Sequence, residues 1–366
     1  MNWATANMTT AARTRTTAEM ATAARRCAPA SGKWIFPSIN CKMFDDTREI
    51  CLKIKNLVES NCSTVRLNFK SFTDEDIERI DKLLTCIKAE DKSSNLDIII
   101  DIPSTKNKYR IHVNAPIQVK KDEDIWIYSK THYSNSSNQI KVANVEESFF
   151  DCIDALDIGE FIYWGDGEGK LRVIDKGNMF LKVKAENNFF LFDNKSLSKF
   201  YKNIELEPKQ LFYIKNIVNT FNIKAIFLSF CESPNELEYF KKLFPTTDIC
   251  AKIETQTAIN YIDSILDVSD GIMIARGDLA LNSSIKDFLL NQNYLAKKTH
   301  FMNKKLYVAT DILMSLNEQD LPSRADLCDF ELLQSYSTYA IILKSSFFHK
   351  KRFSVINKFI ESVSEL

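Results

Sequence analysis

The chain has 366 residues, of which 45% are hydrophobic, so it can bury a sizeable core, and its length alone suggests two domains. Its 48 basic residues equal its 48 acidic residues, which argues against a general nucleic-acid or membrane-surface binder, because both depend on an excess of Lys and Arg. No apolar run reaches the roughly 18 residues that a membrane-spanning helix needs.

Nine cysteines are spread along the chain without a CxxC pair, and there are only four histidines. This pattern predicts neither a disulfide framework nor a zinc site. A reducing, intracellular compartment fits the pattern best, and we expect a cytoplasmic protein.

Residues 1–32 are rich in Ala, Thr and Arg, and Glu19 is their only acid. We expect them to lie outside the fold, as a disordered extension or a targeting peptide. An organelle transit peptide has this composition, and a cloning scar or an over-extended start would also explain it.

From Lys33 onward, strand-like runs alternate with helix-like runs, as in a parallel sheet covered by helices. Thr73 is positioned to cap the second helix, with Glu75 near the positive end of its dipole. The first predicted elements are a strand from Trp34 to Ile39, a helix over 45–60, a strand from Thr64 to Phe69, a helix from Thr73 and a strand from Leu96 to Ile102.

Residues 107–199 break this alternation. Segments such as IQVKKDEDIWIYSK and EFIYWGDGEGKLRVID alternate or are rich in β-formers, which predicts a small all-β domain inserted after the third strand. The run WGDGEG lacks the Lys-Ser/Thr of a phosphate-binding loop and lies between β segments, so we interpret it as a hairpin turn.

The alternation then resumes and brings the total to eight strands and eight helices, which predicts a (β/α)8 TIM barrel formed by residues 33–106 and 200–366. The predicted elements are a helix over 207–222, a strand over 225–230, a helix over 234–244, the strand AKIE, a helix over 255–269, the strand GIMIA, a helix from Lys286 to Lys298, a strand over 306–310, a helix from Ser323, a strand over 339–346 and a helix from about Arg352.

The stretch from Ala251 to Asp278 places charged residues where apolar strands end. Lys252 and Glu254 share one face of a strand, because side chains alternate with period two, and Asp278 closes the next apolar run. The segment between them predicts one amphipathic helix with an apolar face of Ala258, Ile262, Ile265 and Leu266. In barrels of this kind the carboxyl ends of the strands carry the active site.

Six segments resemble the pyruvate kinase family in order and spacing: TVRLNF, LDIIIDIPSTK, AKIE, ARGDL, VATDILMSL and LPSRADLCD. The resemblance runs from about Lys33 to the C-terminus and has no counterpart of the family's C-terminal domain. It implies phosphoryl transfer between phosphoenolpyruvate and ADP, giving pyruvate and ATP. It also implies a divalent cation, Mg²⁺ or Mn²⁺.

The resemblance implies roles for individual residues. Glu254 and Asp278 match the metal-binding pair, Lys252 stabilises the phosphoryl group, and Arg66 binds phosphate. Thr310 is catalytic and substrate-binding, and the backbone of Gly277 and Asp278 binds the substrate carboxylate. The alternative for Lys252 and Glu254 is a plain ion pair at the barrel mouth.

The monovalent-cation site departs from the family pattern. Asn68 and Asp101 match, but Lys70 and Ile102 replace two hydroxyl ligands. Lys106 falls where potassium-independent members carry lysine, so we expect that K⁺ is not required. Lys70 and Lys106 can also be read as solvated surface lysines.

The nucleotide segment departs further, since Lys70, Ser71 and Phe72 replace the family's Ser-His-Gly, and Ser104 replaces a glycine. The candidate nucleotide-binding residues are Asn68, Lys108 and Arg110. Lys108 stands where the family has an arginine that grips the phosphates, and lysine lacks the planar fork of arginine.

Three functions stay open. One is a pyruvate kinase-like phosphotransferase, and another is a Mg²⁺-dependent lyase acting on pyruvate or an enolate on the same barrel. The third is a catalytically silent paralogue that binds a metabolite or partner. We expect no nucleic-acid or membrane partner, and a homo-oligomer is compatible with all three.

Overall fold

The protein is described by a computed structural model that covers residues 35–40, 47–60, 62–69, 74–90, 96–103, 106–129, 141–203, 205–349 and 352–364. The predictions made for residues 1–32, for the Thr73 cap and for the Lys70–Phe72 segment lie outside these described residues.

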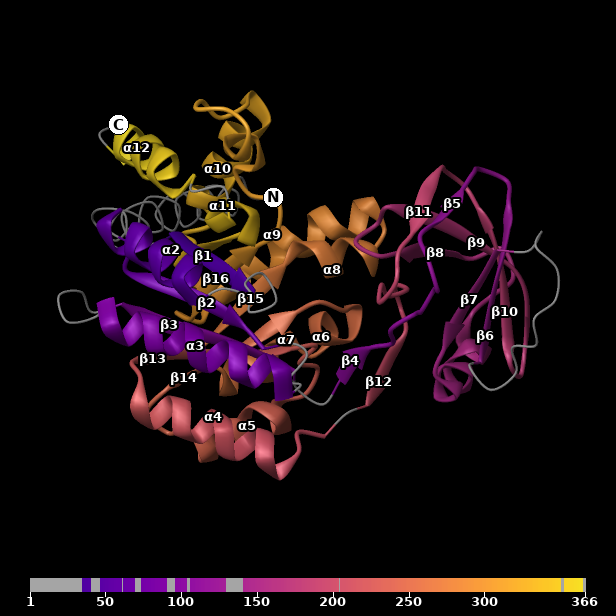
Figure 1. Ribbon diagram of the computed structural model, residues 1–366, viewed down its shortest axis with the longest axis horizontal. Helices are drawn as coiled ribbons and strands as arrows, with labels where there is room; N and C mark the ends of the chain where they lie inside the picture. Colours follow the sequence, from indigo (N-terminus) through magenta and orange to yellow (C-terminus); the bar gives the residue numbers. More distant parts are fainter. Residues whose placement is uncertain are drawn as a thin grey trace, which may run out of the picture.

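Eight parallel strands close into a barrel, in the order β1-β17-β16-β15-β14-β13-β3-β2 (Figure 1). The predicted TIM barrel is therefore confirmed, and the strand ends differ from the predicted ones by at most three residues. The barrel strands are β1 (Ile35–Asn40), β2 (Thr64–Asn68), β3 (Asp97–Pro103), β13 (Ile223–Ser229), β14 (Asp248–Ile253), β15 (Gly271–Ala275), β16 (Lys305–Ala309) and β17 (Ala340–Leu343).

Helices cover the outside of the barrel (Figure 1). Several begin at the hydroxyl caps that helix starts favour; Ser284 and Ser323, for example, accept hydrogen bonds from the backbone N–H groups of Asp287 and Asp326. The helices are α2 (Thr47–Glu59), α3 (Asp74–Glu90), α4 (Pro208–Thr220), α5 (Pro234–Leu243), α6 (Gln256–Asn260), α7 (Ile262–Val268), α8 (Arg276–Leu281), α9 (Ile285–Phe301), η3 (Met314–Asn317), α10 (Arg324–Ser335), α11 (Ser345–His349) and α12 (Phe353–Ser364).

The segment from β4 to β12 forms a separate β body beside the barrel, reached through the antiparallel pair of β4 and β12 (Figure 1). Its main sheet has the order β7-β6-β10-β9-β8 and packs its own apolar core. The elements are β4 (Lys106–Lys108), β5 (Ile117–Val119), β6 (Asp124–Ser129), β7 (Lys141–Val145), η2 (Glu147–Ala155), β8 (Phe161–Trp164), β9 (Gly169–Gly177), β10 (Phe180–Ala185), β11 (Phe189–Leu191) and β12 (Tyr201–Asn203).

Side chains alternate between the two faces of each barrel strand, and this alternation builds two cores. On β14, Ile249 and Ile253 face the helices, whereas Cys250 joins the cluster that fills the barrel interior. Phe227 on β13 and Tyr307 on β16 belong to the same interior cluster, with ring centroids 4.8 Å apart. Ser229 and Lys252, two positions beyond Phe227 and Cys250, therefore reach the carboxyl end of the interior.

The prediction of a single helix over 255–269 is wrong in one respect. The chain forms two short helices, α6 and α7, because Tyr261 leaves helical geometry with φ −103° and ψ 16°. The predicted apolar face is nevertheless buried, with Ala258 and Ile265 at 1% and 0% exposure.

The cysteine pattern predicts no disulfide framework, but Cys51 on α2 and Cys86 on α3 form a disulfide. Neither residue belongs to a CxxC pair, and only the packing of α2 against α3 brings them together. None of the described helices is long and apolar enough to cross a membrane.

Candidate functional site

A pocket of about 260 Å³ opens at the carboxyl ends of the barrel strands. It gathers residues that are far apart in the sequence, since Ser38 lies on β1 and Thr310 lies in the loop after β16. Seven predicted site residues line it: Arg66, Asn68, Lys252, Glu254, Gly277, Asp278 and Thr310.

Lys252 lies inside the barrel among oxygen acceptors, with its side chain only 2% exposed. Its Nζ donates to Ser229 Oγ at 2.9 Å and lies 3.2 Å from Asp101 Oδ2 and 3.1 Å from Glu254 Oε1. Burial acts to lower the pKa of Lys252, but the carboxylates of Asp101 and Glu254 outweigh it and raise the pKa above its ordinary value. The lysine therefore stays charged at neutral pH, and its ion pair with Glu254 forms part of the pocket wall.

Arg66 and Asp101 connect β2 to β3 below the pocket. The Arg66 guanidinium donates to Asp101 Oδ2 through Nε at 3.1 Å and through Nη2, and its Nη1 donates to Ser38 Oγ at 2.8 Å. Asp101 is completely buried, and its other oxygen accepts from Ser229 Oγ at 2.8 Å. Arg66 is thereby fixed where it lines the pocket.

Glu254 and Asp278 bring two carboxylates to this pocket. Glu254 Oε2 accepts from the backbone N–H of Phe230 at 2.6 Å, and Asp278 forms an ion pair with Lys108. Asn282 holds the two residues in place, because its Nδ2 donates to both of their backbone carbonyls, at 3.0 and 2.9 Å.

Carboxylates are the hard oxygen donors that Mg²⁺ and Mn²⁺ take, so this donor set fits a divalent cation. Among the described residues no group of three or more His, Cys, Asp or Glu converges as a metal site. The two carboxylates would therefore share such a cation with oxygens from substrate or water.

Thr310 and Gly277 meet at the pocket edge. A Cβ added to Gly277 would come 3.0 Å from Thr310 Cγ2, so the absence of a side chain there allows the close approach. Thr310 itself has φ +83°, which is rare for a β-branched residue.

Lys106, expected at the monovalent-cation site, and Lys108 and Arg110, expected near the nucleotide, have different surroundings. Lys106 forms an ion pair with Glu232, and Asp101 receives its compensating charge from Arg66 and Lys252. Lys108 pairs with Asp278, whereas Arg110 Nη1 donates to a backbone carbonyl of the inserted β body, that of Asn194, at 3.4 Å. Burial lowers the pKa of Arg110 below its ordinary value, although Asp278 opposes the shift.

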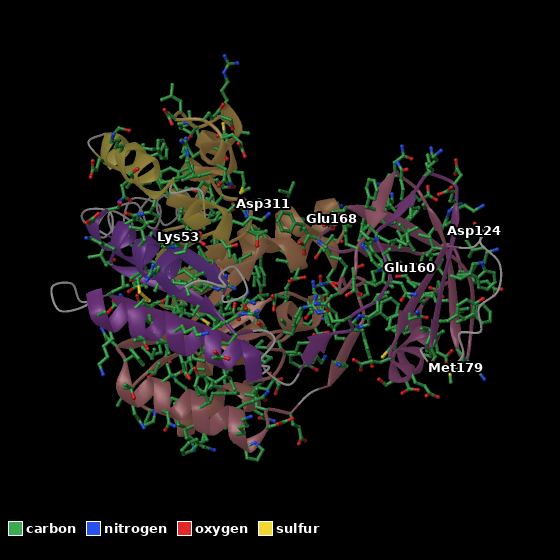
Figure 2. The ribbon with its side chains drawn as sticks, in the orientation of Figure 1. Lys53, Asp124, Glu160, Glu168, Met179 and Asp311 are labelled. Atoms are coloured by element: carbon green, nitrogen blue, oxygen red, sulfur yellow. A yellow bond between two sulfur atoms is a disulfide. The ribbon has the colours of Figure 1, made fainter. Side chains whose placement is uncertain are left out.

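The inserted β body reaches the pocket through the turn between β8 and β9. Asp166 of this turn lines the pocket, and its N–H donates to Glu168 Oε2 at 2.5 Å. Figure 2 shows Glu168 at the end of this body nearest the barrel and Asp124 at its far side. The predicted hairpin is present, with Trp164 paired to Gly169, and it also contributes to the site.

Sequence reasoning missed Ser38, Asp166, Ser229 and Arg276. Ser229 could have been found, because it lies two positions beyond Phe227 on a strand whose alternate residues face the interior. Asp166 could not, since only tertiary structure brings the hairpin to the barrel mouth.

Comparison with known proteins identifies the family and the fold. Residues 37–343 match the family described as pyruvate kinase, barrel domain. A solved pyruvate kinase from Cryptosporidium parvum shares the fold, with a TM-score of 0.69 at 21% identity over 91% of this chain and 70% of that one.

Two curated relatives are pyruvate kinases from Mycoplasma pneumoniae and Thermococcus litoralis. The first is 28% identical over 83% of this chain and 62% of the relative, and the second is 26% identical over 75% and 58%. This chain therefore spans about three fifths of the length of these relatives. Because the family match extends over most of the residues, the chain belongs to the pyruvate kinase family.

Proposed function

We propose that the chain transfers a phosphoryl group between phosphoenolpyruvate and ADP. The observation that carries this proposal is Lys252, a buried and charged lysine held at the wall of a pocket that Arg66, Asp278 and Thr310 also line. A buried ammonium beside an accessible pocket can stabilise a phosphoryl group in flight through its charge.

The reaction breaks the bond between phosphorus and the enol oxygen and forms one from phosphorus to a terminal ADP oxygen. The enolate left behind takes a proton at carbon to give pyruvate. Arg66 binds the phosphate, Lys252 stabilises the transferring group, and Thr310 acts at the enolate and its proton. The backbone of Gly277 and Asp278 holds the substrate carboxylate.

Glu254 and Asp278 would hold Mg²⁺ or Mn²⁺, which when bound neutralises substrate oxygens as charge develops on them. K⁺ is not required in this proposal, because Asp101 already has Arg66 and Lys252 as positive neighbours. Assays with and without K⁺ at constant ionic strength test this point, and a large stimulation by K⁺ would contradict it.

A coupled assay of pyruvate formation tests the main proposal. The unsubstituted chain should form pyruvate from phosphoenolpyruvate only when ADP and Mg²⁺ are present, and Lys252→Met should abolish this activity. Lys53→Met is a matched control, since Lys53 is also a buried lysine, with 4% exposure, but pairs with Glu49 on α2. No pyruvate formation by the unsubstituted chain would refute the proposal.

A second candidate function is enolate chemistry without nucleotide, such as that of a Mg²⁺-dependent lyase. The pairing of Lys108 with Asp278 favours it, because that ammonium is then engaged away from a nucleotide phosphate. Calorimetric titration with ADP and Mg²⁺ separates the two candidates. Absence of ADP binding, with phosphoenolpyruvate or pyruvate still bound, would support the second.

The proposed partners are small molecules, with no nucleic acid or membrane among them, and a homo-oligomer is compatible with the site. The proposed location is the cytoplasm. Size-exclusion chromatography with light scattering and imaging of the tagged full chain test these two points.

A further inference from the structure

Arg276 connects the start of α8 to the loop after β16, and both border the pocket. Its Nε and Nη2 both donate to the backbone carbonyl of Thr310, at 3.1 and 2.8 Å, and Nη2 also donates to the Asp311 carbonyl at 3.1 Å. Arg276 is the first residue of α8, directly before Gly277 and Asp278. One side chain thus links the start of α8, directly after β15, to the loop after β16.

Asp329 on α10 holds the guanidinium from the other side. Its two carboxylate oxygens accept from Arg276 Nη1 at 2.6 Å and from Nη2 at 2.8 Å, which is the bidentate geometry that arginine and carboxylate favour. The Arg276 side chain is 12% exposed and that of Asp329 is 27% exposed, so water screens this pair only partly.

The turn whose carbonyls accept hydrogen bonds from Arg276, at Thr310 and Asp311, has unusual backbone geometry. Thr310, Asp311 and Leu313 all have positive φ, at 83°, 52° and 54°. A β-branched residue rarely adopts such a φ, and conformations of this kind persist only where the surroundings impose them. The carbonyl contacts from Arg276 are the contacts that can impose it on Thr310.

We propose that Arg276 and Asp329 are positioning residues that hold Thr310 in this strained conformation and so direct its hydroxyl into the pocket. The catalytic consequence rests on the proposed function, because it concerns the residue assigned to the enolate and its proton. Arg276 acts through Thr310 and does not itself line the pocket.

A kinetic experiment uses Arg276→Lys, Thr310→Ala and the double variant. Lysine keeps the positive charge but cannot bind two carbonyls and a carboxylate at once. Arg276→Lys should slow exchange of the pyruvate methyl protons with solvent by on the order of 10²-fold, the cost of a misplacement of about 1 Å. The dissociation constant of phosphoenolpyruvate should change less. In the Thr310→Ala background Arg276→Lys should have no further effect.

Arg352→Lys is the matched control. Arg352 likewise donates to backbone carbonyls, those of Leu316 and Gln319, and to one carboxylate, that of Asp320, but it does not line the pocket. It should leave the exchange rate unchanged. Equal losses in the two lysine variants, or an additive effect of Arg276→Lys and Thr310→Ala, would overturn the proposal.

A stability measurement decides the same proposal without any activity. Glycine accepts positive φ, so Thr310→Gly should raise the Tm while Arg276 imposes the strain. In the Arg276→Lys background the turn can relax, and Thr310→Gly should then lower the Tm. Additive shifts would overturn the proposal, whereas loss of phosphoenolpyruvate binding by the unsubstituted chain would refute only the proposed function.

Discussion

The ammonium of Lys252 lies 3.2 Å from Asp101 Oδ2, and the two side chains are 2% and 0% exposed. Asp101 also contacts Arg66 and Ser229, so a single carboxylate sets the position of both Arg66 and Lys252. Breaking a buried pair of this kind by removing one partner typically costs about 3–5 kcal/mol. The charge network therefore connects stability to the candidate chemistry.

Asp101→Asn should move the alkaline limit of activity to lower pH. Lys252 must carry its proton to stabilise a phosphoryl group, and Asp101 is the largest of the charges that raise its pKa. Without that charge the lysine loses its proton at a lower pH. The measurement is the pH profile of kcat/KM.

The same pKa shift has a consequence for stability. Because the folded-state pKa of Lys252 is raised, its contribution to stability is fully present below the ordinary value of 10.5 and is lost as pH rises through the folded-state pKa.

The control for the activity profile of Asp101→Asn is Asp248→Asn, which removes the partner of Lys305 at the other end of the barrel. It should leave the pH profile of activity unchanged. An unshifted profile in Asp101→Asn would contradict the prediction.

Lys108→Met should strengthen binding of Mn²⁺ and weaken binding of ADP. Lys108 pairs with Asp278 from the strand that joins barrel and inserted body, so its removal leaves that carboxylate more negative for a cation. A gain of up to about tenfold in Mn²⁺ affinity corresponds to about 1.4 kcal/mol. Calorimetric titrations with each ligand measure both effects.

Lys195→Met is the control for Lys108→Met, because Lys195 forms its ion pair with Glu168 within the inserted body. Parallel losses of Mn²⁺ and ADP affinity in Lys108→Met would show that the lysine supports the site generally and does not compete with the cation.

The barrel and the strand-end charges could be predicted from the sequence, because both follow from periodicity. Lys252 on β14 and Glu254 directly after it alternate with the apolar Ala251 and Ile253, so local sequence determines their common face. The partners of Lys106 and Lys108 could not be predicted, since Glu232 and Asp278 approach them only after the chain has closed the barrel. The hydrogen bonds from Arg276 to the Thr310 carbonyl could not be predicted either, since the start of α8 and the loop after β16 meet only in the folded chain.

The free energy of unfolding should fall in alkaline solution because the buried thiol of Cys62 resists ionisation in the folded chain. This thiol is 6% exposed and donates to the Thr64 carbonyl at 3.3 Å, and burial raises its pKa from 9.0 to about 12. In the unfolded chain it ionises from its ordinary pKa, so between the two values the free energy of unfolding falls by about 1.4 kcal/mol per pH unit. The contribution is fully present below pH 9.

Cys62→Ala should remove that part of the slope, although the lost packing lowers stability at every pH. Denaturant unfolding followed at several pH values measures the difference between the two chains. Cys328→Ala is the control, since Cys328 is exposed and free. Equal slopes in Cys62→Ala and the unsubstituted chain would contradict the prediction.

Cys51→Ser should lower the free energy of unfolding by about 4 kcal/mol under non-reducing conditions, because the disulfide to Cys86 closes a loop with a sequence separation of 35. It should leave kcat unchanged, since α2 and α3 contribute no residue to the pocket wall. Denaturant unfolding with and without dithiothreitol is the measurement, and the difference between the two chains should largely vanish on reduction. Cys328→Ser is the control for loss of a free thiol. A non-reducing peptide map that lacks a linked Cys51–Cys86 pair would contradict the prediction and would favour the reducing compartment expected from the cysteine spacing.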